Sequence, residues 1–257
     1  MKRKASELAR IARDMLNRRY TIPMGAFVTA SLIPAVLEIP FSLFSSDSPS
    51  TMQMIVVALA EFLITLIEQV LFIGVLKGHL ELTRNHPFKI KMIFSPFTAG
   101  TDRFFGAVSL FDLMMIPLLC PGIASYLYLH YAGTGALTVT LFVLGCLVSA
   151  ALLFWFFIHY LVVFCFLLEY PQMKVLAAFH ECRPAMRGHK KCMASILFRF
   201  IGWICLIACS FGIASLWAVP HMIELLTVFY LDLTGELDRI PVRDYHTASG
   251  GFSNPFI

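Results

Sequence analysis

The Lys and Arg residues of this chain are confined to four clusters. The twenty basic residues lie within residues 2–19, 77–103, 174–199 and 239–243. Three long runs between the clusters contain no Lys or Arg, namely residues 20–76, 104–173 and 200–238. If each run forms two membrane-spanning helices, every cluster lies on the same side of the bilayer. This asymmetry is the positive-inside pattern, and it predicts a multi-pass membrane protein with its basic side and both termini in the cytoplasm.

The composition supports a membrane location. The mean hydropathy is +0.77, and only 14% of the residues are charged, whereas soluble globular chains have about 25%. A one-sided basic face fits the anionic lipids of the cytoplasmic leaflet, where each Lys or Arg near the surface gains about 1 kcal/mol. Nucleic-acid binding is not expected, because no exposed basic domain carries groove-reading or base-stacking elements.

The hydropathy pattern predicts an all-α fold, a polytopic membrane helix bundle. Six transmembrane helices are expected at residues 22–44, 54–76, 106–129, 137–168, 193–211 and 213–233. The fourth of these is longer than the ~30 Å hydrocarbon core requires, so it must tilt or project into the cytoplasm. The membrane domain then covers residues 21–233, after an N-terminal helix at 1–20 and before a flexible cytoplasmic tail at 234–257.

Basic amphipathic segments precede three of the spans. In the first, Leu8, Ile11, Ala12, Met15 and Leu16 recur with helical spacing and form one apolar stripe. Such a helix is typical of the membrane interface, as are the segments 90–97 and 173–183 on the cytoplasmic side. The candidate contacts to lipid head groups are Arg13, Arg18, Arg19, Arg187, His189, Lys190 and Lys191.

Acidic and His residues inside the apolar runs are the candidates for a functional site, because charge at the bilayer centre is costly. The candidate intramembrane polar pathway consists of Glu61, Glu68, His159, His221 and Glu224. Within the runs only His can act as a cationic partner for these acids. The pattern suits a proton- or substrate-coupled transporter. The alternative is that the acids only hold the helices together by hydrogen bonds.

Motifs for catalysis, metals and cofactors were not found. The seven Cys are odd in number and show no C-x-x-C spacing, so neither a disulfide framework nor a zinc ribbon is predicted. The sequence contains no H-E-x-x-H, G-x-S-x-G, Walker or dinucleotide-binding motif. We therefore expect a protein that is not an enzyme and that has no catalytic residue, metal site or cofactor.

The C-terminal half carries a set of short motifs. They are Glu169-Tyr170-Pro171, Met186-Arg187-Gly188-His189-Lys190, Phe200-Ile201-Gly202-Trp203, Gly212-Ile213, Leu216-Trp217, Pro220 and Phe229-Tyr230. Over residues 170–233 this set resembles a bacterial integral membrane family catalogued as domain of unknown function 975. The resemblance implies six spans in the bacterial cell (inner) membrane and supplies no known functional residues. Two features depart from the family's pattern. Family members usually have Pro-Gly-Ile shortly before the acid-Pro turn, whereas fifty positions separate the Pro-Gly-Ile at residues 121–123 from Pro171 here. In addition, Pro184 interrupts a segment that in the family looks like a continuous helix.

Three functional classes remain open at this stage. The leading hypothesis is an uncharacterised, non-enzymatic membrane protein that handles, senses or transports a lipid-like or small hydrophobic molecule. The alternative is a structural or regulatory protein that docks a protein partner on its basic face or forms a homo-oligomer. A membrane-embedded lipid enzyme would need polar groups that converge at head-group level, around Glu169, His180 and His189.

Overall fold

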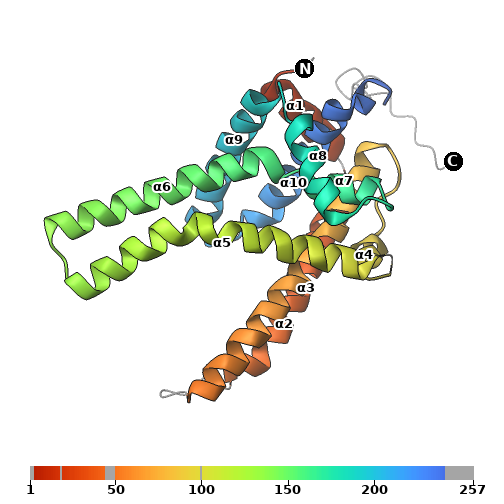
Figure 1. The fold of residues 1–257 in the computed structure, drawn as a ribbon. Coiled ribbons are helices and arrows are strands. Elements are labelled where there is room, and N and C mark those ends of the chain that lie inside the picture. The colour runs from red at the N-terminus through yellow and green to blue at the C-terminus, as the bar shows by residue number, and fades with distance from the viewer. Residues whose placement is uncertain (1–2, 18, 44–49, 99, 241–257) are drawn as a thin grey trace.

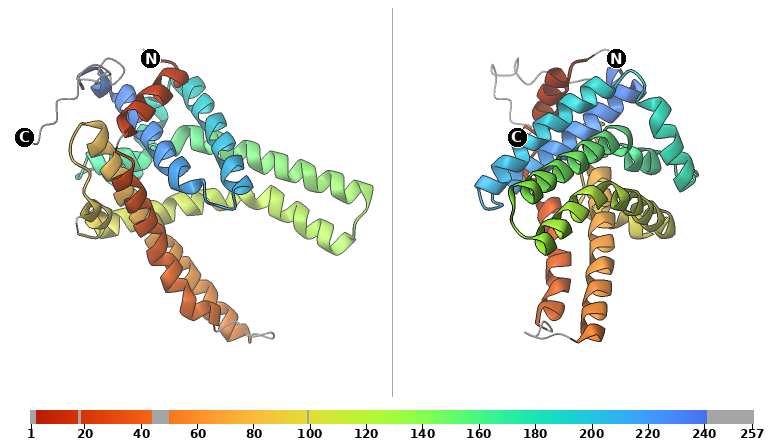
Figure 2. Two further views of the ribbon diagram at one scale, coloured as in Figure 1. Left: turned by 180° about the vertical axis from the view of Figure 1, so that it is seen from behind. Right: turned by 60° about the vertical axis from the view of Figure 1, so that its left-hand side comes forward.

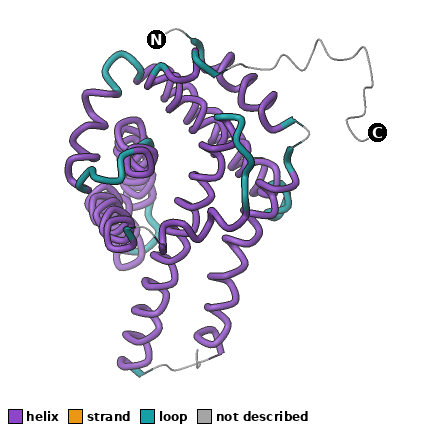
Figure 3. The backbone as a smooth tube through the Cα atoms, turned by 90° about the vertical axis from the view of Figure 1, so that its right-hand side faces the viewer, coloured by secondary structure: helices purple, strands orange, loops and turns teal. Residues whose placement is uncertain are grey.

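The chain folds into helices joined by short connections. The computed structural model describes residues 3–17, 19–43, 50–98 and 100–240, and every regular element in them is helical (Figure 3). In chain order, the elements are α1 (Ala5–Leu16), α2 (Thr21–Leu43), α3 (Thr51–Thr83), η1 (Ile90–Phe94), α4 (Ser95–Thr98), α5 (Thr101–Ala132), α6 (Ala136–Tyr160), α7 (Val163–Glu169), α8 (Val175–Ala185), α9 (Lys190–Cys209), α10 (Ser215–Thr234) and η2 (Glu236–Asp238).

Six helical segments in the described part are long and apolar enough to cross a membrane, which confirms the predicted fold class. They are Thr21–Phe41, Thr51–Thr83, Thr101–Ala132, Ala136–Glu169, Lys190–Cys209 and Ser215–Thr234. The fourth comprises two helices, since the chain turns at Leu161 and Val162 between α6 and α7. The prolines do not break the helices that contain them, because α2 continues through Pro34 and α5 through Pro117.

Three helical hairpins, α2–α3, α5–α6 and α9–α10, fan out from a common end (Figures 1 and 2). The α2–α3 and α5–α6 hairpins diverge strongly, and the shorter α9–α10 hairpin lies between them (Figure 1). The short elements α1, η1, α4, α7, α8 and η2 gather where the hairpins meet, and we call them together the cap. The outer ends of α2–α3 and α5–α6 therefore have few protein neighbours.

Helix α10 is the centre of the packing. It contacts α1, α2, α3 and α9, and 61% of its most apolar window is buried, against 11% for the α6–α7 segment. Leu225, Phe229 and Tyr230 on α10 are almost fully enclosed. The core of the protein thus lies around α10, beside the cap.

Helix α1 forms as its apolar spacing predicts, but its stripe faces protein. Leu8, Ala12 and Leu16 are fully buried, and α1 packs against α10, α9 and α3. The apolar stripe that the spacing predicts is therefore present, and α10 and its neighbours bury it. Arg3 fastens this end of the chain through ion pairs to Asp232 at 3.0 Å and Asp238 at 2.9 Å.

Some basic residues lie inside the span-length helices and not only at their ends. Lys77 is in the last two turns of α3, because α3 continues to Thr83 and not only to the predicted end at residue 76. Arg199 lies halfway along α9, where its side chain is exposed. Basic residues are therefore not strictly separated from the spans. At the other end of the fold, Gly235 terminates α10 with a positive φ, and Leu237 in η2 is buried. Residues 241–257 of the predicted tail lie outside the described residues.

Candidate functional site

An apolar cavity of about 500 Å³ lies between α3, α6, α9 and α10. Every side chain that the structure places on its wall is apolar. Representative lining residues are Phe72 from α3, Leu153 and Phe157 from α6, Phe200 and Ile204 from α9, and Met222 from α10. The cavity is therefore suited to an apolar chain or ring system and not to a polar solute.

A second cavity of about 290 Å³ continues the first and adds polar groups. The two share the lining residues Phe72, Leu161, Ile223 and Leu226, so they form one groove, which we call the groove from here on. Glu68 and Gln69 supply the polar side chains of its second part. The Gln69 Nε2 amide donates a hydrogen bond of 2.9 Å to Asp112 Oδ2 and so connects α3 with α5. The groove thus has a long apolar part and one polar end.

Glu224 on α10 anchors a fully buried polar cluster. Its Oε2 lies 2.7 Å from His79 Nδ1, and its Oε1 accepts a hydrogen bond of 2.8 Å from the Thr83 hydroxyl. Thr227 completes the cluster, with its hydroxyl oxygen 3.1 Å from that of Thr83. Both carboxylate oxygens have partners, as burial requires, so the cluster ties α3 to α10.

The sequence interpretation placed Glu224 in a pathway but missed His79 and Thr83. Both residues were assigned to the loop after the second span, because the span was predicted to end at residue 76. The missed signal is their spacing: His79 and Thr83 are four apart, which puts them on the same face of a helix that continues.

The cap contains its own network of ion pairs. The Arg84 guanidinium at the end of α3 donates to Glu236 at 2.8 Å and to both Glu169 oxygens at 2.7 Å. The hydrogen bonds to Glu236 and Glu169 outweigh the effect of burial and raise the pKa of Arg84. Arg103 donates to the carbonyl oxygen of Leu167 at 2.8 Å, near the end of α7. Arg84 and Arg103 therefore connect the long helices α3 and α5 to the cap elements α7 and η2.

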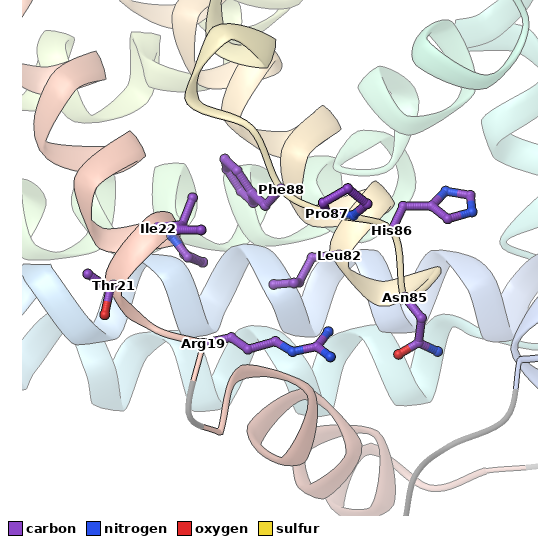
Figure 4. A pocket seen from close by; sticks show the side chains of 9 residues that line it. Arg19, Thr21, Ile22, Leu82, Asn85, His86, Pro87 and Phe88 are labelled. Carbon is purple, nitrogen blue, oxygen red and sulfur yellow. The ribbon is translucent and has the colours of Figure 1, made fainter. Parts of the chain in front are cut away.

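A further pocket of about 510 Å³ opens beside the cap (Figure 4). It lies between the start of α2 and the end of α3, and its wall combines Arg19, Thr21 and Asn85 with the apolar side chains of Leu82 and Phe88. In Figure 4 the Arg19 side chain extends along the pocket toward Asn85. The pocket could accept an anionic group at its basic side.

The five predicted pathway residues lie in different surroundings. Glu61 is exposed on the outer half of α3, whereas Glu68 lines the groove. His159 is buried, and its Nδ1–H donates to the Trp155 carbonyl oxygen at 2.7 Å. His221 packs beside the Trp203 ring at a centroid distance of 5.5 Å, and Glu224 belongs to the buried cluster. The structure therefore brings only Glu68 to the groove.

The predicted head-group contacts lie mostly on the surface. Arg13, Arg187, Lys190 and Lys191 are exposed, and Arg19 lines the pocket beside the cap. His189 is half-buried, and burial lowers the pKa of its imidazole. Arg18 lies outside the described residues.

Comparison with known proteins identifies the family. Neither the curated proteins nor the solved structures contain a match to this chain. A family model described as "Protein of unknown function (DUF975)" matches residues 1–236, which include all six span-length helices. The match extends well beyond the motifs at residues 170–233 and covers the cap, the groove and the buried cluster. The chain therefore belongs to the DUF975 family.

Proposed function

We propose that this protein binds a lipid-like or small hydrophobic molecule in the groove, within the bilayer, and handles it without chemical conversion. The observation that carries the proposal is the apolar cavity of about 500 Å³. Its volume lies within the range of about 300–1,000 Å³ that is typical of small-molecule sites. Its wall comes from four helices, so a bound molecule would contact α3, α6, α9 and α10 together.

The helices pack closely elsewhere in the molecule, so the space left around the groove is a specific feature of that region. Where α5 meets α6, small residues allow close approach: the Gly122 amide donates to Ser149 Oγ at 2.8 Å, and Gly145 leaves no room for a Cβ beside Ser125. Around the groove, large side chains such as Phe154 and Phe200 leave space between them. An unfilled space would deprive these side chains of dispersion contacts, which favours an apolar occupant.

The charge distribution supports a location in the bacterial inner membrane with the cap in the cytoplasm. In this orientation Arg13, Arg187, Lys190 and Lys191 can contact anionic head groups. Arg84, by contrast, is engaged by Glu169 and Glu236. This internal use of cap charge favours the lipid-handling role over the docking of a protein partner on the basic face.

Saturable photolabelling tests the proposal. The purified protein is reconstituted in phosphatidylcholine vesicles and labelled with a diazirine derivative of a long-chain alcohol. The expected result is labelling that saturates, that unlabelled alcohol competes away, and that maps to α6, α9 and α10. Labelling that arises only from probe dissolved in the bulk lipid would instead increase in proportion to the probe concentration.

A matched pair of variants assigns the labelling to the groove. Ala150 and Ala151 are both exposed, but only Ala150 lines the apolar cavity. Ala150→Phe should remove the saturable labelling because the ring fills the cavity, and Ala151→Phe should retain it. Equal saturable labelling of both variants would contradict the proposal.

A further inference from the structure

We propose that the ligand of the groove is an amphipathic cation, whose ammonium group binds Glu68 while its apolar chain fills the cavity. This inference rests on the proposed function and specifies its ligand class. It also separates Glu68 from the other predicted pathway residues, because Glu68 alone among them lines the groove.

The charged group that is free at the end of the groove is a hydrogen-bond acceptor. Within the described part of the chain, the Glu68 carboxylate has neither a hydrogen bond nor an ion pair. The neighbouring Gln69 amide already donates to Asp112 Oδ2 at 2.9 Å. The charged group available to a ligand is therefore an unpaired carboxylate, which a donor or a cation would satisfy and an anion would not.

The surrounding charge is negative. Glu38 on α2 interacts electrostatically with Glu68. Asp112 on α5 accepts a hydrogen bond from Gln69, the residue that follows Glu68 on α3. No described Lys or Arg lines either part of the groove: Lys77 is more than two turns further along α3, and Arg199 is not among the lining residues. Charge complementarity at this site thus favours a cation.

The position along α3 strengthens this preference. Glu68 lies near the middle of a helix of 33 residues, which places it deep in the hydrocarbon region of a bilayer. An ionised carboxylate there is costly without a partner. A cationic ligand relieves that cost, whereas a neutral ligand gains only from burial of its chain.

Aromatic side chains complete the site. Phe72, one turn after Glu68 on α3, and Phe164 on α7 line the same part of the groove. A cation near an aromatic face is attracted by the ring's negative face, and this combination is typical of sites for quaternary ammonium groups. Beyond Phe72 the wall is entirely apolar and can accept the hydrocarbon chain.

Competition between three amphiphiles of equal chain length tests the inference. Dodecyltrimethylammonium, dodecanol and dodecanoate compete, below their micellar concentrations, with the photoactivatable long-chain alcohol in vesicles of phosphatidylcholine, which carry no net charge. We expect the cation to compete roughly tenfold more strongly than the alcohol, equivalent to about 1.4 kcal/mol, and the anion to be the weakest.

Two variants and one control assign the preference to named side chains. Glu68→Gln should make the cation and the alcohol equal, while the alcohol still binds. Phe72→Leu keeps the wall apolar and should reduce the cation preference a few-fold. Glu61→Gln should leave the tenfold preference unchanged, because Glu61 lies two turns away on α3 and is exposed.

The outcomes separate this inference from the proposed function. Saturable labelling by the alcohol without any preference for the cation would overturn the inference and leave the proposed function standing. A preference that persists in Glu68→Gln would also overturn it. If the wild-type protein shows no saturable labelling and none of the three amphiphiles binds, both proposals are wrong.

Discussion

Helix α10 and the α5–α6 hairpin are both apolar enough to cross a membrane, yet they are built for different surroundings. In α10, 61% of the most apolar window is buried in protein, and the Glu224 carboxylate, with His79 and Thr83 as partners, lies on this helix. Along α6 only a small share is buried, and large side chains such as Leu144 and Leu147 are exposed. Hydropathy alone does not distinguish a helix that faces protein from one that faces lipid.

The two regions also differ in what joins their helices. The α3–α10 contact relies on the buried hydrogen bonds of Glu224, whereas α5 and α6 meet through Gly122, Gly145 and two serines. Buried hydrogen bonds fix one arrangement strongly, because breaking them leaves polar groups without partners. We therefore expect the region around α10 to determine the stability of the protein, and the outer part of the α5–α6 hairpin to contribute little.

Among the polar contacts, the largest effect is expected at Glu224. Glu224→Ala removes the partner of His79 and Thr83, both fully buried, and should lower the free energy of unfolding by about 3 kcal/mol. Thermal unfolding in a mild detergent measures it, with Glu61→Ala as an exposed control on α3. An unchanged melting temperature for Glu224→Ala would contradict the central role of the cluster.

A substitution at Gly74 should cause the next largest loss of stability. A Cβ at this position would overlap the backbone of Ile93 in η1, so Gly74→Ala should cost about 2 kcal/mol. Gly106→Ala is the control, because no other group lies within 4 Å of its added Cβ, and it should be neutral or slightly stabilising. If both substitutions have the same effect on thermal unfolding, η1 does not dock on α3 as described.

Arg84 should have a smaller effect. Arg84→Ala breaks the ion pairs with Glu169 and Glu236, and a cost of about 1 kcal/mol is expected because these side chains are only partly buried. Repeating the thermal unfolding in 1 M salt provides the check. The difference between wild type and variant should shrink, and a difference that is independent of salt would point to packing in place of charge.

The smallest effect is expected in the α5–α6 hairpin. Leu147 is 62% exposed, so Leu147→Ala should change stability by less than about 0.5 kcal/mol. Leu225 on α10 is 1% exposed, and Leu225→Ala should cost about 2–4 kcal/mol. Similar shifts in melting temperature for these two variants would remove the contrast between the regions.

The hydropathy pattern predicted the six span-length helices, because length and apolar content are local properties. It did not predict which faces meet protein. The spacing of Leu8 and Leu16 predicted the apolar stripe of α1, but periodicity identifies an apolar face and not what covers it. Hydropathy also does not define the ends of helices. The second span was predicted to end at residue 76, but α3 continues to Thr83 and so includes His79 and Thr83.

The candidate site was predictable only in part. Glu68 could be selected as an acid inside an apolar run, but its position at the end of a groove depends on residues from distant segments, such as Phe164 and Ile223. No local pattern encodes the space between helices that are separated by nearly a hundred residues. Glu61 illustrates the limit, because it is an acid inside the same apolar run as Glu68 but is exposed.

An experimental structure of the protein in a phosphatidylcholine nanodisc, with dodecyltrimethylammonium added, tests the central claim most directly. We predict an elongated density between α3, α6, α9 and α10, with its head group beside Glu68 and its chain against Phe72 and Phe200. A groove closed by its own side chains, or a bound molecule whose head group lies away from Glu68, would contradict the account.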